Sequence, residues 1–276
     1  LLLLVAEPAV WRSPATAVAI PAVAGASLLA WVFVELRTAT PLVDVRLLSA
    51  PSVLRANIAM AVAGVGLYLL FSVFTRYVQT PADAAYGFAL PGAAAGAALI
   101  PFSVLGFLAG KASPSLIARS TARSVYVGAS VTAMAAAVVF ATASGSLAAV
   151  LIAMAVLGYG VGGISAAMPA LVLAGVPHSE TASVLTINQV VRSIGFAVGS
   201  ALAGVLLATA TPAGAVLPTQ QGFVTAAWWS LLPLGLAAVV IGAAGTRSRL
   251  RADYPFRRRT SAARPDPGSD RATPRP

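Results

Sequence analysis

The sequence predicts an all-α integral membrane protein with seven complete membrane spans. Of its 276 residues, 58% are hydrophobic and only 9% are charged, whereas charged residues make up about 25% of an average soluble domain. The mean hydropathy is +0.87. A water-soluble globule cannot hide so many apolar side chains, and a disordered chain requires low hydrophobicity. The absence of cysteine excludes a fold stapled by disulfides.

Seven segments are long and apolar enough to cross a bilayer, which takes about 20 mostly apolar residues. They are Ala15–Val34, Ala56–Val78, Phe88–Ala109, Val125–Ala143, Leu147–Val172, Ala182–Thr209 and Phe223–Ala244. The apolar stretch Leu1–Ala6 is too short to span, and no Met or charged segment precedes it. We interpret it as the end of a helix, and expect the chain to be the C-terminal part of a longer protein.

Changes in composition predict three parts of the chain. Residues 1–53 contain the end of one linker helix, a second linker helix and a charged cytoplasmic linker. Residues 54–245 form a compact block of six helices with short connections. Residues 246–276 are predicted to be a disordered, basic cytoplasmic tail, because the last 32 residues carry nine Arg and three acids without apolar periodicity.

The distribution of basic residues predicts the orientation. If the C-terminus is cytoplasmic, 15 of the 18 basic residues lie inside, only Arg12 and Arg76 lie outside, and Arg192 lies within a span. An excess of Lys and Arg in cytoplasmic loops is the usual pattern of membrane proteins. All but one of the basic residues are Arg and alanine is abundant, which is typical of GC-rich bacterial genomes. We therefore expect a multi-pass protein of the bacterial plasma membrane.

Small residues recur at four-residue spacing in the six-helix block. Such pairs let helix backbones approach closely in lipid, where no hydrophobic effect drives helices together. The predicted packing or hinge positions are Gly158, Gly162, Gly195, Gly199, Gly204 and Pro101. The pattern fits either static packing or an interface that slides, and the sequence does not choose between them.

Polar residues inside the spans are few and costly, so they are candidates for a substrate cavity. They are Asn57, Tyr68, Asn188, Gln189 and Arg192. Asn57 and Tyr68 serve equally well as hydrogen-bonding residues between helices. No Asp, Glu or His falls within any predicted span. Arg192 is therefore expected to face a partner on a missing part of the protein, an anionic substrate, or backbone carbonyls.

Other chemistries find no support in the sequence. With no Cys and one His, a metal cluster is not expected, and no Gly-rich loop followed by Lys-Ser/Thr provides a nucleotide site. No Ser, His and Asp are grouped at a common depth, so we predict neither catalytic residues nor an enzyme. The basic residues behind the net charge of +10 are too sparse to form a surface that binds the phosphates of a nucleic acid. No cofactor is predicted.

The order of several motifs resembles the fourteen-spanner drug:proton antiporter subfamily of the major facilitator superfamily. The motifs are Pro41–Leu48, Leu54–Asn57, Thr75–Gln79, Tyr86–Phe88, Ile100–Ser103, Met168–Pro169 and Asn188–Arg192 with the glycines that follow it. The resemblance implies two six-helix halves joined by two linker helices, here Leu1–Ala6 and Ala15–Val34. This chain would be the C-terminal half, and the N-terminal half with the main proton-coupling carboxylates would be missing.

The same resemblance implies roles for two glycine-containing segments. The stretch from Gly106 to Arg123 is similar to the family's inner-loop motif without its acidic residue. Its motif-like positions are Gly110, Lys111, Arg119 and Arg123. The Gly195 and Gly199 pair lies where pseudo-symmetry would place a counterpart of the antiporter motif, but it lacks the motif's Pro.

Three functions remain open at this point. The first is half of a proton-driven exporter of small amphipathic drugs or metabolites, whose partners are the bilayer, substrate, protons and its own N-terminal half. The second is a non-transporting remnant or an assembly partner. The third is a seven-helix receptor or light sensor, which the sequence disfavours because its only Lys is expected in a loop.

Overall fold

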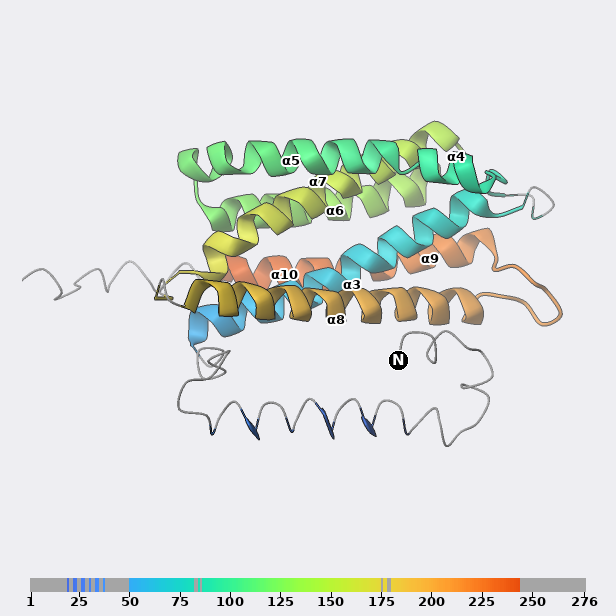
Figure 1. The fold of residues 1–276 in the computed structure, drawn as a ribbon. Coiled ribbons are helices and arrows are strands. Elements are labelled where there is room, and N and C mark those ends of the chain that lie inside the picture. The colour runs from blue at the N-terminus through green and yellow to red at the C-terminus, as the bar shows by residue number, and fades with distance from the viewer. Residues whose placement is uncertain are drawn as a thin grey trace, which may run out of the picture. The chain divides into compact units, whose positions relative to one another are not determined.

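Long apolar helices make up the described part of the chain (Figure 1). The structure is a computed structural model that describes residues 50–81, 84, 86–174, 176–177 and 180–243, with isolated positions between 19 and 37. The helices are α3 (Pro51–Gln79), α4 (Gly92–Ala97), α5 (Ile100–Arg119), α6 (Ala122–Ala143), α7 (Leu147–Val172), α8 (Thr181–Thr209), α9 (Gln220–Trp229) and α10 (Leu231–Gly242). Within these residues the fold is all-helical, without strands.

Six segments are long and apolar enough to cross a membrane when α4 with α5, and α9 with α10, are each counted as one span. They are Pro51–Gln79, Gly92–Arg119, Ala122–Ala143, Leu147–Val172, Thr181–Thr209 and Gln220–Gly242. These spans confirm the six predicted for the C-terminal block. Most of the predicted span Ala15–Val34 lies outside the described residues, as does the predicted tail 246–276.

The second of these spans differs from the prediction at both ends. The predicted helix Phe88–Ala109 begins later, at Gly92, and continues to Arg119. Gly87 has a φ of +80°, and this turn together with Pro91 delays the start of the helix. At the other end the Ser113 hydroxyl donates to the Ala109 carbonyl at 2.7 Å, and the helix runs on through Pro114.

The expected inner loop between Ala109 and Val125 is wrong, because α5 continues through most of it. Gly110 and Lys111 lie inside α5 and Arg119 lies in its last turn, so only Ser120 and Thr121 separate α5 from α6. Lys111, the only lysine in the chain, is therefore in a helix and not in a loop. Its side chain is exposed, so it does not sit in an enclosed pocket of the kind a covalently bound chromophore needs.

Two spans are interrupted near proline residues. The break between α4 and α5 falls immediately before Pro101, which occupies the first turn of α5. Proline fits there because its missing N–H would have no partner within the helix. The break between α9 and α10 falls at Ser230, three residues before Pro233, and the Ser230 hydroxyl donates to the Ala227 carbonyl at 2.6 Å.

The contacts between helices relate the first three spans of the bundle to the last three. Helix α3 packs against α8 and α10, and in the same way α7 packs against α5 and α6. In addition, α3 contacts α7, and α6 contacts α10. Exchanging α3 with α7, α5 with α8, and α6 with α10 leaves these principal contacts unchanged. The first triplet in chain order is α3, α5 and α6 and the second is α7, α8 and α10, so alternating crossings would reverse the sense of the second. The contact pattern is the one expected of two inverted three-helix repeats.

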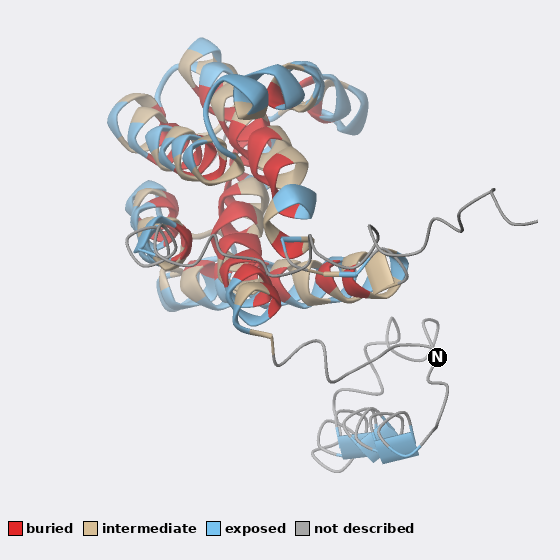
Figure 2. Cartoon of the chain, turned by 90° about the vertical axis from the view of Figure 1, so that its left-hand side faces the viewer, coloured by how far each residue is buried: buried red, intermediate tan, exposed pale blue. Residues whose placement is uncertain are grey.

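Buried residues lie on the helix sides that face one another, and exposed residues lie on the outer sides (Figure 2). The core is dominated by α3, whose buried side chains include Met60, Leu67, Phe74 and Tyr77. Large apolar residues such as Phe107, which is 70% exposed, point away from the bundle. Apolar side chains on the outside as well as in the core are expected of a protein whose outer surface contacts lipid tails rather than water.

Glycines bring two pairs of helices into backbone contact. A Cβ at Gly195 or Gly199 in α8 would collide with the carbonyl oxygen of Ala61 or Val65 in α3, respectively. A Cβ at Gly158 or Gly162 in α7 would collide with the carbonyl oxygen of Phe102 or Gly106 in α5. The α3–α8 and α5–α7 crossings are exchanged by the repeat symmetry, and both are built on glycine.

One of the glycines predicted to pack against another helix does not do so among the described residues. A Cβ at Gly204 would meet nothing within 4 Å, so the packing contact expected from its spacing to Ser200 is not found among the described helices. Gly204 lies in the same helix as Gly195 and Gly199 but on a side that no described helix covers.

We predict that Gly158→Ala destabilises the protein, whereas Gly204→Ala does not. The added methyl group at position 158 meets the backbone of α5, and overpacking of this kind typically costs about 1–3 kcal/mol. At position 204 the alanine meets open space and has the better helix propensity. Thermal unfolding in detergent, followed by circular dichroism, measures both. Equal midpoints for the two variants would contradict the proposed backbone contact.

Candidate functional site

Two of the predicted cavity residues, one on α3 and one on α8, form a buried hydrogen bond. The Asn188 amide Nδ2 donates to Asn57 Oδ1 at 2.8 Å, although the two residues are 131 positions apart. Both side chains are buried, with exposed fractions of 4% and 6%. The Asn57 Nδ2 group finds no acceptor among the described residues. The pair therefore joins the two helices while leaving one amide donor unused.

A cation and a row of aromatic rings lie further along the same two helices. The Arg192 guanidinium is 5.4 Å from the centre of the Phe196 ring, and that ring stacks on Tyr68 at 4.4 Å. Tyr68 lies 5.4 Å from Phe71, which in turn lies 5.3 Å from Phe102. The row thus crosses from α8 over α3 to α5, and each member is half-buried.

Arg192 has no carboxylate partner in the described part of the chain. Its Nε is enclosed and without an acceptor there. The only acid among the described residues is Glu180, at the start of α8, and twelve residues of helix separate the two by about 18 Å. An attraction to an aromatic face contributes about 0.5–2 kcal/mol, which does not replace an ion pair. The cation is therefore available to an external anion.

Gln189 is the one predicted cavity residue that does not join this group. It is exposed on α8, whereas its neighbour Asn188 is buried against α3. Successive helical residues point about 100° apart, so the two amides cannot serve the same site. The structure brings together Asn57 with Asn188, and Tyr68 with Arg192.

The aromatic residues that support Arg192 are not among the predicted site residues. Phe196 follows Arg192 by four positions and Phe71 follows Tyr68 by three, so each pair shares a helix face. This spacing was a usable signal, but phenylalanine in an apolar helix does not stand out from core residues. The contact between the two faces depends on the packing of α8 on α3.

A second missed group closes the end of the bundle where α3 ends. The Tyr77 hydroxyl donates to the Ser144 carbonyl at 3.1 Å, and Gln220 Nε2 lies 3.3 Å from both the Tyr77 hydroxyl and Ser144 Oγ. The Tyr86 hydroxyl donates to the Pro218 carbonyl. Burial, reinforced by the neighbouring Tyr77, raises the pKa of Tyr86 above its usual range, so this donor keeps its proton at neutral pH.

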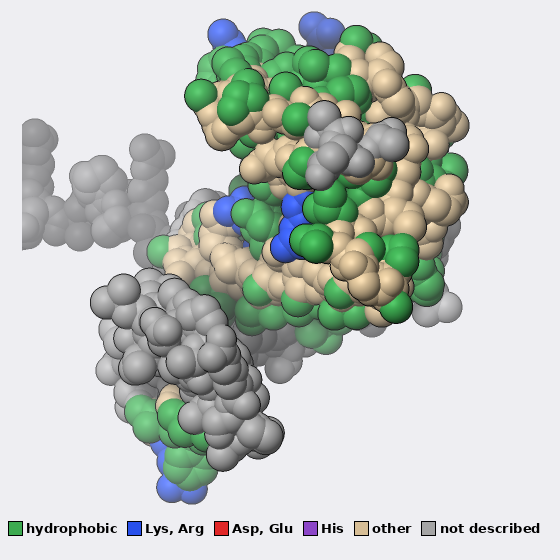
Figure 3. All heavy atoms as spheres, turned by 90° about the vertical axis from the view of Figure 1, so that its right-hand side faces the viewer, with side chains coloured by type: hydrophobic (Ala, Val, Ile, Leu, Met, Phe, Trp, Pro, Cys, Tyr) green, Lys and Arg blue, Asp and Glu red, His purple; other side chains and the backbone are tan. Residues whose placement is uncertain are grey.

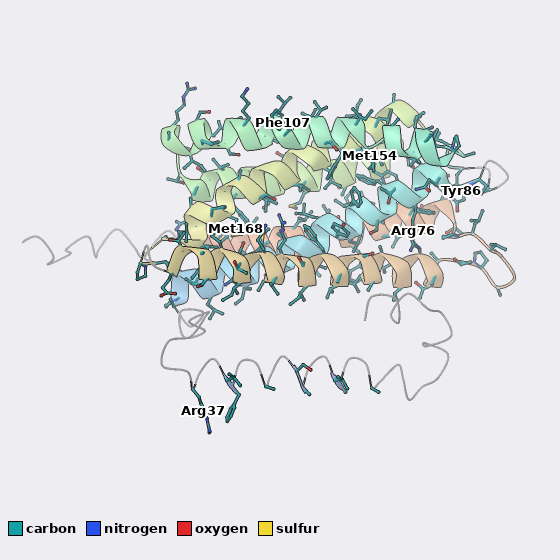
Figure 4. The ribbon with its side chains drawn as sticks, in the orientation of Figure 1. Arg37, Arg76, Tyr86, Phe107, Met154 and Met168 are labelled. Carbon is teal, nitrogen blue, oxygen red and sulfur yellow. The ribbon has the colours of Figure 1, made fainter. Side chains whose placement is uncertain are left out.

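The same end is packed by aromatic rings. Tyr77 meets Phe140 edge-on at 5.0 Å and Phe223 at 5.2 Å. Tyr86 and Arg76 are found toward this end of the molecule (Figure 4), and Figure 3, which looks onto it, shows basic side chains within a hollow bordered by hydrophobic ones. We interpret the Tyr77 group as a structural element that closes this end of the bundle, because its polar atoms form hydrogen bonds with one another.

The motif-like basic residues gather at the opposite end, around the short α5–α6 turn. Lys111 and Arg119 are exposed, and Arg123 in the first turn of α6 is half-buried. The Arg123 Nε is enclosed without an acceptor among the described residues. Reciprocal bonds between Thr121 and Ser124 cap α6 and set the turn. At Gly110 an added Cβ would meet nothing, so this motif-like glycine makes no close contact.

Comparison with protein-family models and with curated proteins identifies no relative of this chain. No protein-family model matches the chain, and no curated protein is significantly similar to it. Within the described residues no group of His, Cys, Asp or Glu is placed to hold a metal ion. The fold and composition define the class: an α-helical, multi-pass membrane protein that carries a buried amide pair and an unmatched arginine.

We predict that Asn57 and Asn188 are energetically coupled. Side-chain hydrogen bonds between membrane helices contribute about 0.6 kcal/mol on average and rarely exceed about 1.7 kcal/mol. A double-mutant cycle of Asn57→Ala and Asn188→Ala, measured by unfolding in detergent, should give a coupling energy in this range. Gln189→Ala is the matched control and should not couple to Asn57→Ala. Additive effects of the two asparagine substitutions would refute the bond.

Proposed function

We propose that the chain is the C-terminal half of a proton-coupled exporter of the major facilitator superfamily, from its fourteen-spanner drug:proton antiporter subfamily. In this proposal a linker helix precedes the six described spans. The protein resides in a bacterial plasma membrane with its C-terminus in the cytoplasm. It exports small amphipathic molecules, such as drugs or secondary metabolites, in exchange for protons.

The observation that carries this proposal is the pair of inverted three-helix repeats. Many secondary transporters are built from inverted repeats, and six spans arranged as two such triplets make up one half of the major facilitator fold. The exchange of helix contacts supports this proposal, and so does the motif order in the sequence, which is a separate property of the chain.

The unequal burial of the spans supports a missing half. Only 17% of the most apolar stretch of Gly92–Arg119 and 22% of that in Thr181–Thr209 is buried, compared with 33–56% in the other four spans. These two spans are exchanged by the repeat symmetry. A second six-helix half would cover the equivalent exposed faces of α5 and α8.

The aromatic row with Arg192 would form one wall of the substrate cavity. Binding sites for small molecules are mostly apolar and aromatic, with a few polar groups that orient the ligand. The half-buried rings of Phe196, Tyr68 and Phe71 offer flat apolar surface, and Arg192 supplies one charge. Such a wall fits amphipathic molecules better than ions or sugars.

In this proposal, transport follows from rocking of two halves about the cavity. The glycine crossings let α3 and α8 move as one body, because their backbones are in direct contact. The described helices contain no Asp, Glu or His. The proton-coupling carboxylates are therefore proposed to reside in the N-terminal half.

The same lack of acids in the described helices favours one alternative, a non-transporting remnant or assembly partner. The coding DNA immediately upstream distinguishes the two. Six or more further spans in the same reading frame would support the exporter. A start codon directly before Leu1 would support the remnant.

We predict that Arg192→Ala reduces proton-driven efflux by the complete gene product about tenfold at low substrate concentration. A charge-assisted contact contributes about 1.5–3 kcal/mol, and 1.4 kcal/mol corresponds to a tenfold change. Initial efflux rates in everted membrane vesicles, normalised to protein level, measure the effect. Arg192→Lys should retain part of the activity. Arg76→Ala, at an exposed position, is the control that should transport normally. Undiminished efflux by Arg192→Ala would make Arg192 a structural residue.

A further inference from the structure

A crevice opens between α5 and α6, and its lining shares no residue with the Arg192 group. Its volume is about 370 Å³, within the range of about 300–1,000 Å³ found for small-molecule sites. One face of α5 lines it at Ala109, Ser113, Leu116 and Ser120, which follow one another at helical spacing. Tyr159 of α7 lies at its side. None of these residues belongs to the proposed substrate cavity.

The length of the crevice matches one leaflet of a bilayer. Ala109 and Ser120 are eleven residues apart on α5, which is about 16 Å along the helix axis. The hydrocarbon core of a bilayer is about 30 Å thick, so one leaflet contributes about 15 Å. A ligand that fills the crevice from the helix ends inward has the length of an acyl chain.

The lining suits a hydrocarbon in spite of its hydroxyl groups. Ser113 donates to the Ala109 carbonyl at 2.7 Å, and Thr132 donates to the Gly128 carbonyl at 2.9 Å. Ser120 donates to the Leu116 carbonyl at 2.7 Å. Because these three hydroxyl groups each donate to a backbone carbonyl four residues earlier, their side chains present mainly carbon and lone pairs to a ligand.

Two arginines flank the end of the crevice at the α5–α6 turn. Ser120 and Ser124 line this end, Arg119 lies in the last turn of α5, and Arg123 lies in the first turn of α6. No Asp or Glu occurs between Asp83 and Glu180. The Arg123 Nε is enclosed without an acceptor among the described residues, and Arg side chains are long enough to swing toward a nearby anion.

We propose that this crevice binds an anionic phospholipid, with its phosphate at Arg119 and Arg123 and an acyl chain between α5 and α6. Basic pockets between membrane helices suit such headgroups. An apolar slot of leaflet length with Arg119 and Arg123 beside its end at the α5–α6 turn is complementary to both parts of the lipid. A free phosphate would use only the cations, and a neutral lipid would use only the slot. This proposal does not depend on the transport function.

The headgroup contact is tested with the double variant Arg119→Gln/Arg123→Gln. The full chain is purified in mild detergent, and its binding of phosphatidylglycerol and phosphatidylcholine is measured by native mass spectrometry. The native chain should prefer phosphatidylglycerol, and the double variant should bind it roughly tenfold to thirtyfold more weakly. Arg55→Gln/Arg76→Gln removes the same charge from exposed positions of α3 and should leave the preference unchanged.

The acyl-chain contact is tested separately with Gly128→Leu. Gly128 lines the crevice, and a Cβ there would meet nothing within 4 Å, so a leucine at this position is expected to extend into the slot. Gly204→Leu adds the same side chain at a position that does not line this crevice, where a Cβ also meets nothing within 4 Å, and is the control. Gly128→Leu should lose bound phosphatidylglycerol, while Gly204→Leu and the unfolding midpoints of both variants should remain as in the native chain.

Three outcomes would overturn the proposal. The first is equal binding of phosphatidylglycerol and phosphatidylcholine by the native chain. The second is undiminished phosphatidylglycerol binding by the Arg119→Gln/Arg123→Gln variant, which does not alter the slot and serves even where Gly128→Leu fails to fold. The third is displacement of the lipid by millimolar inorganic phosphate, because this would identify a free-anion site rather than a lipid site.

Discussion

Backbone contact through glycine is the constraint on which the packing of this bundle depends. In lipid the hydrophobic effect does not draw helices together, so stability comes from close packing and hydrogen bonds between helices. Gly195 and Gly199 place α8 against α3, and Gly158 and Gly162 place α7 against α5. The buried Asn57–Asn188 bond and the stacking of Phe196 on Tyr68 both need the first of these contacts. A larger residue at either crossing would move the site apart.

The placement of charge follows from the same packing. Arg192 lies against the Phe196 ring and has no carboxylate partner among the described residues, and Arg119 and Arg123 flank the crevice between α5 and α6. A cation in a membrane protein is costly unless it is matched. In the two proposals the first of these cations faces a substrate or a partner half, and the second pair binds lipid. They lie on different helix pairs and have separate tests.

The exchange of contacts between the first and the last three spans accounts for the different exposure of the described helices. Helices α3 and α7 lie in the middle of the contacts, while α5 and α8 each keep a wide exposed face. Symmetry assigns the same role to α5 and α8, and their exposed faces are those that another half would cover in the proposed transporter. The group around Tyr77 ties α3 to the α6–α7 turn and to α9, and closes the end of the bundle where α3 ends.

The sequence by itself determined the membrane class, six of the spans and the list of polar residues at depth, because length and hydropathy decide whether a helix enters a bilayer. It misplaced the span at Phe88–Ala109, since Lys111, Ser113 and Pro114 resemble a loop although the helix continues through them. The tertiary structure alone decided that Asn188 meets Asn57 while Gln189 does not, that Gly204 makes no contact, and that Phe196 supports Arg192. These facts depend on which helix faces which, and helical periodicity defines a face without naming its neighbour.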